Sequence, residues 1–415
     1  MSYIRFLGGA DEVGREAIMV DTGKEKILMD YGINVQTLEA PAVPEKLPDT
    51  VFLSHAHLDH SGFLPELYRT GYKGKVFLTP VTKELCSLLL KDSMKVQRIR
   101  GMETKYTIDH IHMFESLSKT IGFNNPIEVN STEVRLFDAG HIPGSASILI
   151  TTTNKRILYT GDIKFEDTEL MNAAYQDFKD IDILITETTY SYKNHPPRKE
   201  MEKKLREHVK DVVHRGGIAL LPCFAVGRTQ EILLIVHNLG FPVYMDGMGI
   251  DATKIILNHK NSIRTPGKLK KAFSNAIKIR RRNQRIKALR EPGIIITTSG
   301  MLQGGPVHFY MKHLYNRKEC SIVLLGYQIE DTPGRILLET GRYINEDLDV
   351  RPKMEIKFMD FSAHCSRDNL IKFIEKVNAD KTFLVHGEHT HEFSKELNKR
   401  GINAIAPEDN EKFTL

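Results

Sequence analysis

Three histidines and an aspartate lie within six residues of this chain, in the sequence SHAHLDHSG. They are His55, His57, Asp59 and His60, and they follow the apolar run VFLS at 51–54, which predicts a buried strand. In an extended segment His55 and His57 point to the same side, and Asp59 and His60 then lie where the chain turns. Imidazole and carboxylate groups hold Zn²⁺ in an open, catalytic geometry. With 17 histidines in 415 residues, a chance cluster on a solvated loop is the weaker interpretation. The cluster therefore predicts a metal site at a strand end, which distant parts of the chain must complete.

Four further polar residues stand at the ends of expected strands. His141 lies in DAGHIPGSAS between two glycines, Asp162 closes ILYTGD in the position of a bridging carboxylate, and His386 closes TFLVHG. Taken singly, each histidine would more often be structural. Together with the cluster they predict a pair of metals, because two ions about 3.5–4 Å apart clamp the attacking and leaving oxygens of a phosphodiester. Asp30 ends the run ILMD, and we expect it to orient a ligand rather than to bind metal itself.

Short β-branched runs alternate with longer amphipathic stretches along the chain, which predicts an α/β fold. Ser366 is the expected N-cap of the last helix, with Asp368 in its first turn. The expected strands are 51–54, 75–79, 156–162, 181–187, 218–224, 293–300, 321–327, 354–360 and 382–387, and the expected helices are 82–98, 200–214 and 366–377.

The spacing of the polar candidates also predicts the domain organisation. They occupy 55–60, 141 and 162, are absent from nearly the whole middle of the chain, and reappear at 364 and 386. If both groups build one site, the middle is an inserted domain and the last segment returns to complete the first. We expect domain segments at 1–187, 188–345 and 346–415.

Composition excludes several other classes of protein. No apolar run approaches the roughly 18–20 residues of a membrane span, and the first residues lack the features of a signal peptide. We therefore expect a cytoplasmic protein with no membrane association. The four cysteines are scattered without the close pairing of a zinc knuckle or a disulfide scaffold. A net charge of +5 permits a polyanionic partner but does not require one.

The order of these motifs resembles a known family. The sequence HAHLDH, followed by His141, Asp162 and His386, resembles the metallo-β-lactamase fold, a four-layer αββα sandwich with its metals at one edge. ETTY with Glu187, FSAHCSRDNL with His364 and LVHGEH with His386 are similar to the additional motifs of the β-CASP nucleases. The likeness extends over essentially the whole chain and implies an inserted β-CASP α/β domain. It is greatest to archaeal nucleases resembling the catalytic subunit of the cleavage and polyadenylation specificity factor. Longer archaeal members carry RNA-binding KH domains ahead of the nuclease core, and we expect none here.

The resemblance implies a ligand set and catalytic roles. Imidazole titrates near neutral pH, so His364 is the expected general acid for the leaving 3′-oxygen, with Glu187 holding its tautomer. A purely structural role is the alternative for His364. With Asp59, these two are the predicted catalytic residues. The family pattern implies two zinc ions, one held by His55, His57 and His141, the other by Asp59, His60 and His386, with Asp162 bridging them.

Three glycine-bearing loops inside the expected insertion predict phosphate binding. Glycine lets backbone N–H groups converge on phosphate oxygens. The loops also resemble those that line the β-CASP RNA channel, although Asp331 stands where relatives often have glycine. The basic run 278–290 suits a phosphate backbone, with a solvated helix face as an equal alternative. The loops are 222–231, 298–310 and 326–335, and the residues expected to bind RNA are Arg228, Ser299, Gly300 and Arg335.

Together these features predict a zinc-dependent ribonuclease that cuts single-stranded RNA endonucleolytically, in RNA processing or decay. We leave open 5′→3′ exonuclease activity and a homodimer formed through the C-terminal end, 407–415. RNA rather than DNA is implied by resemblance, because DNA-processing relatives lack the histidine that His386 supplies. One alternative is a catalytically silent RNA-binding subunit, which would lack ligands. The other is a small-molecule hydrolase of the same fold, which would not need so long an insertion.

Overall fold

The computed structural model describes residues 2–415, which form two units. Every candidate metal ligand belongs to unit 1, and the three glycine-bearing loops belong to unit 2. Unit 1 consists of the residues up to Glu166 together with Ala173–Asn194 and His364–Leu415, and unit 2 consists of Asp167–Asn172 and His195–Ala363.

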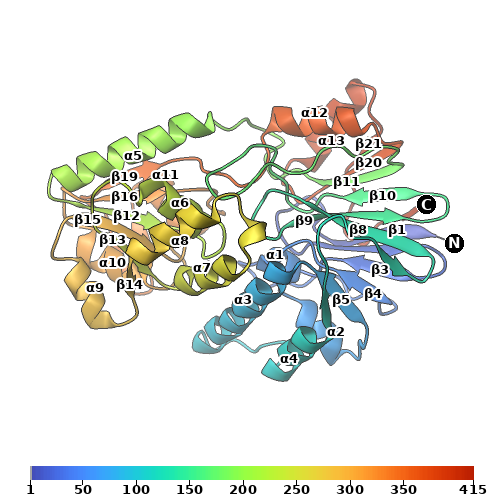
Figure 1. Ribbon diagram of the computed structural model, residues 1–415, viewed down its shortest axis with the longest axis horizontal. Coiled ribbons are helices and arrows are strands. Elements are labelled where there is room, and N and C mark those ends of the chain that lie inside the picture. Colours follow the sequence, from blue (N-terminus) through green and yellow to red (C-terminus); the bar gives the residue numbers. More distant parts are fainter. Residues whose placement is uncertain (1) are drawn as a thin grey trace. The chain divides into compact units, whose positions relative to one another are not determined.

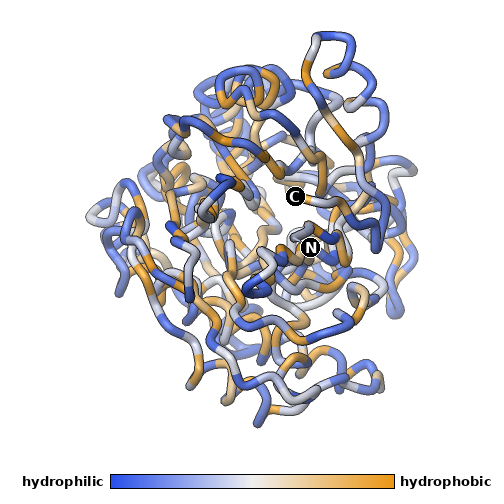
Figure 2. The backbone as a smooth tube through the Cα atoms, turned by 90° about the vertical axis from the view of Figure 1, so that its right-hand side faces the viewer, coloured by the Kyte–Doolittle hydropathy of each residue, from blue (hydrophilic) through white to orange (hydrophobic). Residues whose placement is uncertain are grey.

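Unit 1 contains two seven-stranded sheets. The first has the order β22-β1-β2-β3-β4-β5-β6, and its strands β3 to β6 run parallel. The last strand pairs with the first, so the two ends of the chain lie side by side (Figures 1 and 2). The strands of this sheet are β1 (Tyr3–Gly8), β2 (Ala17–Asp21), β3 (Lys26–Met29), β4 (Thr50–Phe52), β5 (Lys75–Leu78), β6 (Ser118–Thr120) and β22 (Lys412–Thr414).

The second sheet has the order β21-β20-β11-β10-β9-β8-β7. Strand β11 pairs in parallel with β20, which joins residues about 200 positions apart and brings the C-terminal segment into the unit. The strands of this sheet are β7 (Ile127–Val129), β8 (Thr132–Asp138), β9 (Ala146–Thr151), β10 (Arg156–Tyr159), β11 (Ile183–Glu187), β20 (Lys381–Val385) and β21 (Ala404–Ile405).

The two sheets face each other across one apolar core, and helices cover their outer faces (Figure 1). Alternation along β9 shows how this works: Ile148 and Ile150 pack between the sheets, whereas Leu149 points outward against helices. Phe373 and Phe393 pack on that outer face. This αββα layering confirms the expected fold class. The helices of unit 1 are α1 (Leu58–Ser61), α2 (Leu64–Arg69), α3 (Pro80–Ile99), α4 (Ile108–Leu117), α12 (Arg367–Val377) and α13 (Thr390–Lys399).

Unit 2 is built on a six-stranded sheet, β14-β13-β15-β12-β16-β19, in which every pairing is parallel. Its central strands, IALLP and GIIIT, are buried throughout, as expected when helices cover both faces of a parallel sheet. The strands are β12 (Ile218–Pro222), β13 (Val243–Asp246), β14 (Ile277–Ile279), β15 (Gly293–Thr297), β16 (Ser321–Leu324) and β19 (Glu355–Phe358), beside a hairpin of β17 (Tyr343–Asn345) and β18 (Leu348–Val350).

Seven α-helices and one short 3₁₀ helix accompany this sheet among the described residues. Helix α5 packs on β12, α6 on β15 and α7 on β13. They are α5 (Arg198–His214), α6 (Arg228–Val236), α7 (Gly249–Asn258), η1 (Lys260–Ser262), α8 (Pro266–Asn275), α9 (Arg282–Ala288), α10 (Val307–Leu314) and α11 (Pro333–Thr340).

The division into units differs from the segment boundaries expected at 187/188 and 345/346. Strand β19 pairs with β16, so the stretch expected to begin the third segment instead adds to the sheet of unit 2. The chain returns to unit 1 only at His364. In addition, the short segment Asp167–Asn172 belongs to unit 2, where Glu231 accepts hydrogen bonds from the N–H groups of Glu169 and Leu170. No helix among residues 2–415 is long and apolar enough to cross a membrane.

Candidate metal centre and catalytic site

The histidine cluster lies where β4 gives way to helix α1. His57 has extended φ/ψ angles of −59° and 148° at the N-terminus of α1, and Asp59 and His60 occupy its single turn. The helix is held by the backbone: Tyr31 N–H donates to the His60 carbonyl at 2.8 Å, and Glu16 N–H donates to the Asp59 carbonyl at 2.9 Å. The strand therefore ends before the cluster, and two different backbone conformations direct its side chains to two sides.

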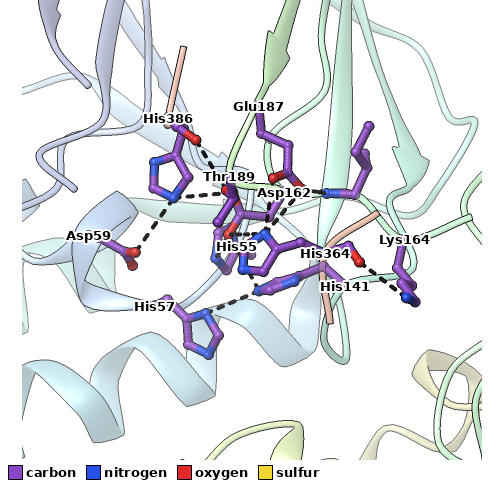
Figure 3. A network of polar contacts seen from close by, with 12 residues as sticks. His55, His57, Asp59, His141, Asp162, Lys164, Glu187, Thr189, His364 and His386 are labelled. Atoms are coloured by element: carbon purple, nitrogen blue, oxygen red, sulfur yellow. Dashed lines mark hydrogen bonds and ion pairs between the residues drawn. The ribbon is translucent and has the colours of Figure 1, made fainter. Parts of the chain in front are cut away.

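One group of ligand atoms gathers around one oxygen of Asp162 (Figure 3). His55 Nε2 and His141 Nε2 each lie 3.4 Å from Asp162 Oδ2. His141 Nε2 also lies 3.2 Å from His57 Nδ1. Two nitrogens bound to the same tetrahedral zinc at about 2.0–2.1 Å lie roughly 3.3 Å apart. The spacing of this group therefore fits one metal ion.

A second group gathers around the other oxygen of the same carboxylate. His60 Nε2 lies 3.3 Å and His386 Nε2 lies 3.6 Å from Asp162 Oδ1, and Asp59 Oδ2 lies 3.8 Å from His386 Nε2. His386 reaches this place because it directly follows β20, in a left-handed backbone conformation with φ of 51°. Asp162 thus faces one set of imidazoles with each oxygen, as a bridging carboxylate would.

Several of these inward-facing atoms have no hydrogen-bond partner within the chain. They are His55 Nε2, His60 Nε2, His386 Nε2 and Asp162 Oδ1, all buried. Buried polar atoms are almost always satisfied, so a cluster of unsatisfied nitrogens and oxygens pointing at one another fits a bound cation. The surrounding histidines, led by His60, hold the pKa of Asp162 well below its usual range despite burial. That carboxylate is therefore ionised at neutral pH.

Asp30, which we expected from the sequence to orient a ligand, lies behind His60. Its Oδ2 is 2.7 Å from His60 Nδ1, and it accepts hydrogen bonds from the hydroxyls of Ser54 at 2.6 Å and Tyr159 at 2.7 Å. Burial alone would lower the pKa of His60, but Asp162 and Asp30 raise it well above its ordinary value. The contact with Asp30 fixes the ring so that Nε2 points at Asp162.

Glu16 is an equivalent carboxylate that the sequence analysis missed. It is fully buried, and its Oε2 lies 3.3 Å from His386 Nδ1. Burial raises the pKa of Glu16 to about 7, with His386 opposing the rise. Gly9 leaves the room for it, since a Cβ there would lie 2.1 Å from Glu16 Oε2. The only sequence signal is a charged residue directly before the apolar strand AIMVD, which suggests no ligand chemistry by itself.

His364 and Glu187 come together beside the first group. His364 Nδ1 is 3.1 Å from both oxygens of Glu187 and 3.9 Å from Asp162 Oδ2. Ile163 N–H donates to Glu187 Oε1 at 2.8 Å, and Lys164 Nζ donates to the His364 carbonyl at 3.1 Å, so both partners are fixed by backbone contacts. Burial opposes protonation, but Glu187 and Asp162 raise the pKa of His364 above its ordinary value. Asp162, Glu187 and His364 are also close enough to form a third possible ligand group, so geometry alone permits either role for His364.

The three glycine-bearing loops follow β12, β15 and β16, which are neighbours in the parallel sheet of unit 2. They touch each other: a Cβ on Gly300 would lie 3.0 Å from the Phe224 nitrogen, and Gln328 Nε2 donates to the Gly300 carbonyl at 3.3 Å. Asp331 has φ of 61°, a conformation that glycine adopts most easily. Loops at the carboxyl ends of such strands are the usual ligand sites of parallel sheets.

The residues expected to bind RNA lie in these loops, where some of them also make contacts within the protein. Arg228 is the first residue of α6, Ser299 Oγ accepts from Gln303 N–H at 3.0 Å, and Arg335 pairs with Glu339. In the basic run, Arg280 pairs with Asp251 and Arg285 with Asp246, both at 2.6 Å. These ion pairs favour a structural role for part of the basic run.

Comparison with known proteins agrees with this description. Family models match as the Beta-Casp domain over residues 229–337, the anti-Pycsar protein Apyc1 over 10–214, and the Zn-dependent metallo-hydrolase RNA specificity domain over 349–407. A probable RNase MJ4 from Methanocaldococcus jannaschii is 40% identical, and the match covers 99% of this chain and 100% of that protein. RNase aCSPSF2 from Saccharolobus solfataricus is 36% identical, with 100% and 85% covered.

Two other matches are to a longer protein and to a solved structure of low sequence identity. The transcription termination factor FttA of Methanocaldococcus jannaschii is 34% identical, with 93% of this chain and 67% of that longer protein covered. A crystal structure of a protein of unknown function from Enterococcus faecalis V583 superposes with a TM-score of 0.63 over 100% of both chains at 15% identity, which shows the shared fold alone.

Proposed function

This chain belongs to the β-CASP family of metallo-β-lactamase-fold ribonucleases, and from that premise we propose that it hydrolyses phosphodiester bonds within single-stranded RNA. The observation that carries the proposal is the position of Asp162, whose two oxygens each face a separate set of imidazoles. Such an arrangement suits a pair of metals rather than one. The names of the two ribonuclease relatives support RNA as the substrate.

The donor set fits a pair of zinc ions, for which Asp162 and the two sets of imidazoles would supply the ligands. When bound, a zinc pair supplies an activated water at neutral pH and positive charge for the phosphoryl oxygens. The chain's own residues would hold these ions in place, and Asp30 and Glu16 orient His60 and His386. The first ion would be held by His55, His57 and His141, the second by Asp59, His60 and His386, with Asp162 between them.

His364 is the proposed general acid. Glu187 accepts a hydrogen bond from His364 Nδ1, which leaves Nε2 as the atom that gives its proton to the leaving 3′-oxygen. Ile163 N–H fixes Glu187, and Glu187 in turn orients the imidazole of His364, so the proton on Nε2 is positioned before the reaction.

The test compares labelled single-stranded RNA with DNA of the same sequence, using zinc-loaded protein and an Asp162→Asn variant as the inactive control. We expect RNA to be cut much faster than DNA, and Asp162→Asn to cut neither. Equal rates on RNA and DNA would contradict the assignment of substrate.

A circular RNA distinguishes the mode of cleavage, because it has no end from which an exonuclease could start. We propose that the circle is opened, with 5′→3′ exonuclease action as an additional activity in RNA processing or decay.

A homodimer through the C-terminal end is part of the same proposal, since β22 forms an edge of its sheet and edge strands pair readily with another chain. The cytosolic location stays a prediction from the sequence.

A further inference from the structure

A row of aromatic rings extends from His364 within unit 1. Tyr190 lies in the segment that follows β11, with its ring centroid 6.0 Å from that of His364. Tyr192, two residues later, stacks on Tyr190 at 6.0 Å with an interplanar angle of 21°. His389, just before α13, lies 4.9 Å from Tyr192. Two successive ring contacts therefore connect the catalytic histidine with Tyr192.

The row runs from the interior to the surface. Tyr190 is 2% exposed, whereas Tyr192 is 46% exposed. The exposed ring of Tyr192 therefore offers a flat apolar surface to a binding partner. Because Tyr190 is buried beneath it, the ring of Tyr192 is supported in a fixed orientation and would lose little entropy on binding a flat partner.

A cation stands beside both rings. Lys193 Nζ lies 5.0 Å from the centroid of Tyr190 and 5.7 Å from that of Tyr192, within the range of cation–π attraction. The ammonium group gives the surface a positive charge suited to a phosphate. A flat π surface with a neighbouring cation is the combination by which proteins hold single-stranded nucleic acid.

We propose that Tyr192, supported by Tyr190 and flanked by Lys193, is a stacking platform for one unpaired nucleobase near the scissile phosphate of the RNA substrate. The platform rests on the proposed ribonuclease function. Every base has a π face, so stacking here gives affinity with little dependence on sequence. The platform also selects against double-stranded RNA, since a paired base is stacked inside its helix and presents no free face.

The first experiment measures binding by fluorescence anisotropy, using a phosphorothioate-linked single-stranded RNA and the zinc-loaded full chain. We expect Tyr192→Ala to raise Kd about tenfold, within the range found for loss of one base–aromatic stack. Tyr192→Phe keeps the ring and should bind nearly as well as the wild type. Tyr175→Ala is the matched control, because Tyr175 is 41% exposed and stacked on Phe137 but has no ring contact with the site residues. Equal Kd values for Tyr192→Ala and Tyr192→Phe would overturn the proposal.

The second experiment locates the base by replacing nucleotides one at a time with abasic ones and measuring KM for cleavage. In the wild type we expect one position at which loss of the base raises KM about tenfold, equal to about 1.4 kcal/mol. In Tyr192→Ala the same abasic change should have no further effect, because the stack is already lost. A wild type that is insensitive at every position overturns the platform while leaving ribonuclease function intact. A wild type that cuts no RNA removes the proposed function instead.

Discussion

His60 and His386 each use both ring nitrogens, and this arrangement determines how well they can hold a metal. In each ring Nε2 faces Asp162 and Nδ1 faces a buried carboxylate, Asp30 at 2.7 Å or Glu16 at 3.3 Å. A carboxylate behind a ligand imidazole fixes its tautomer and makes it more basic. The proposed second metal position would therefore be supported by two carboxylates that do not touch the metal.

Replacing Glu16 by glutamine tests this support, because it removes the charge and keeps the shape. We expect Glu16→Gln to weaken retention of one zinc ion by 10- to 100-fold, the usual scale for such partners. Zinc release to a chromogenic chelator measures the change directly, without reference to activity. Glu25→Gln is the matched control, since Glu25 is equally buried in unit 1 but faces Asn130 rather than a histidine. If both variants release zinc like the wild type, Glu16 does not position His386.

His364 is the residue for which geometry permits two roles, general acid or metal ligand. We expect His364→Ala to keep a normal zinc content and to slow RNA cleavage by two orders of magnitude or more, the scale of general acid catalysis. Metal analysis of the purified variant and single-turnover kinetics give the two readouts. A variant that has lost zinc would make His364 a ligand of the Asp162 and Glu187 group instead.

At the scale of single residues, the sequence predicted those that stand in a recognisable motif and missed those that do not. The cluster at 55–60 lies in one short stretch, so its chemistry is visible before folding. Glu16 acquires its role only because the chain returns from His364 onward and places His386 beside it. Tyr192 likewise gains meaning only from its contacts with Tyr190 and His389.

At the scale of elements, one short helix determines where two of the proposed ligands, Asp59 and His60, point. Helix α1 has only one turn and could not persist without tertiary support. It is packed against the segment after β3, where a Cβ on Gly32 would lie 1.6 Å from the Asp59 carbonyl. Backbone hydrogen bonds from Tyr31 and Ile33 reach His60 and Leu58 across the same contact.

Substituting Gly32 by alanine should therefore displace α1. Because the obstructing atom belongs to the backbone, no side chain can move aside, and we expect a loss of about 2 kcal/mol or more in the free energy of unfolding. Zinc content should fall as well, since Asp59 and His60 move with the helix. Urea denaturation and metal analysis measure the two effects. Gly267→Ala is the control: Gly267 has open space around its Cα within α8, so alanine there should be neutral or slightly stabilising.

Several strands that the sequence predicted, such as β11, β12 and β15, are buried throughout, and their apolar runs are continuous. Strands such as β6 and β7 are three residues long and partly exposed, so only their pairing partners define them. The segment containing β19 was expected in the third domain segment because nothing in its sequence identifies β16 as its pairing strand.

At the scale of the whole molecule, the proposed metal ligands come from four separate stretches of unit 1, which a bound metal would tie together. The cluster follows β4, His141 follows β8, Asp162 follows β10 and His386 follows β20. Since the unfolded chain cannot hold these groups together, the free energy of metal binding adds to the free energy of folding. The three glycine-bearing loops of unit 2 contain none of these ligands.

Removal of zinc should therefore lower the stability of unit 1 selectively. At free zinc one hundred times Kd, each site contributes about 2.7 kcal/mol, which corresponds to roughly 5–10 °C in Tm for a unit of this size. Scanning calorimetry of the full chain, with and without EDTA, should show one transition moving down while the other stays. Asp162→Asn is the control, because without the bridging carboxylate its transition should already be low and should not respond to EDTA. Re-addition of zinc should restore both Tm and RNA cleavage in the wild type. A Tm that does not change with zinc would mean that the protein core alone holds the imidazoles in place. The metal-site assignment would then fail together with the proposed chemistry.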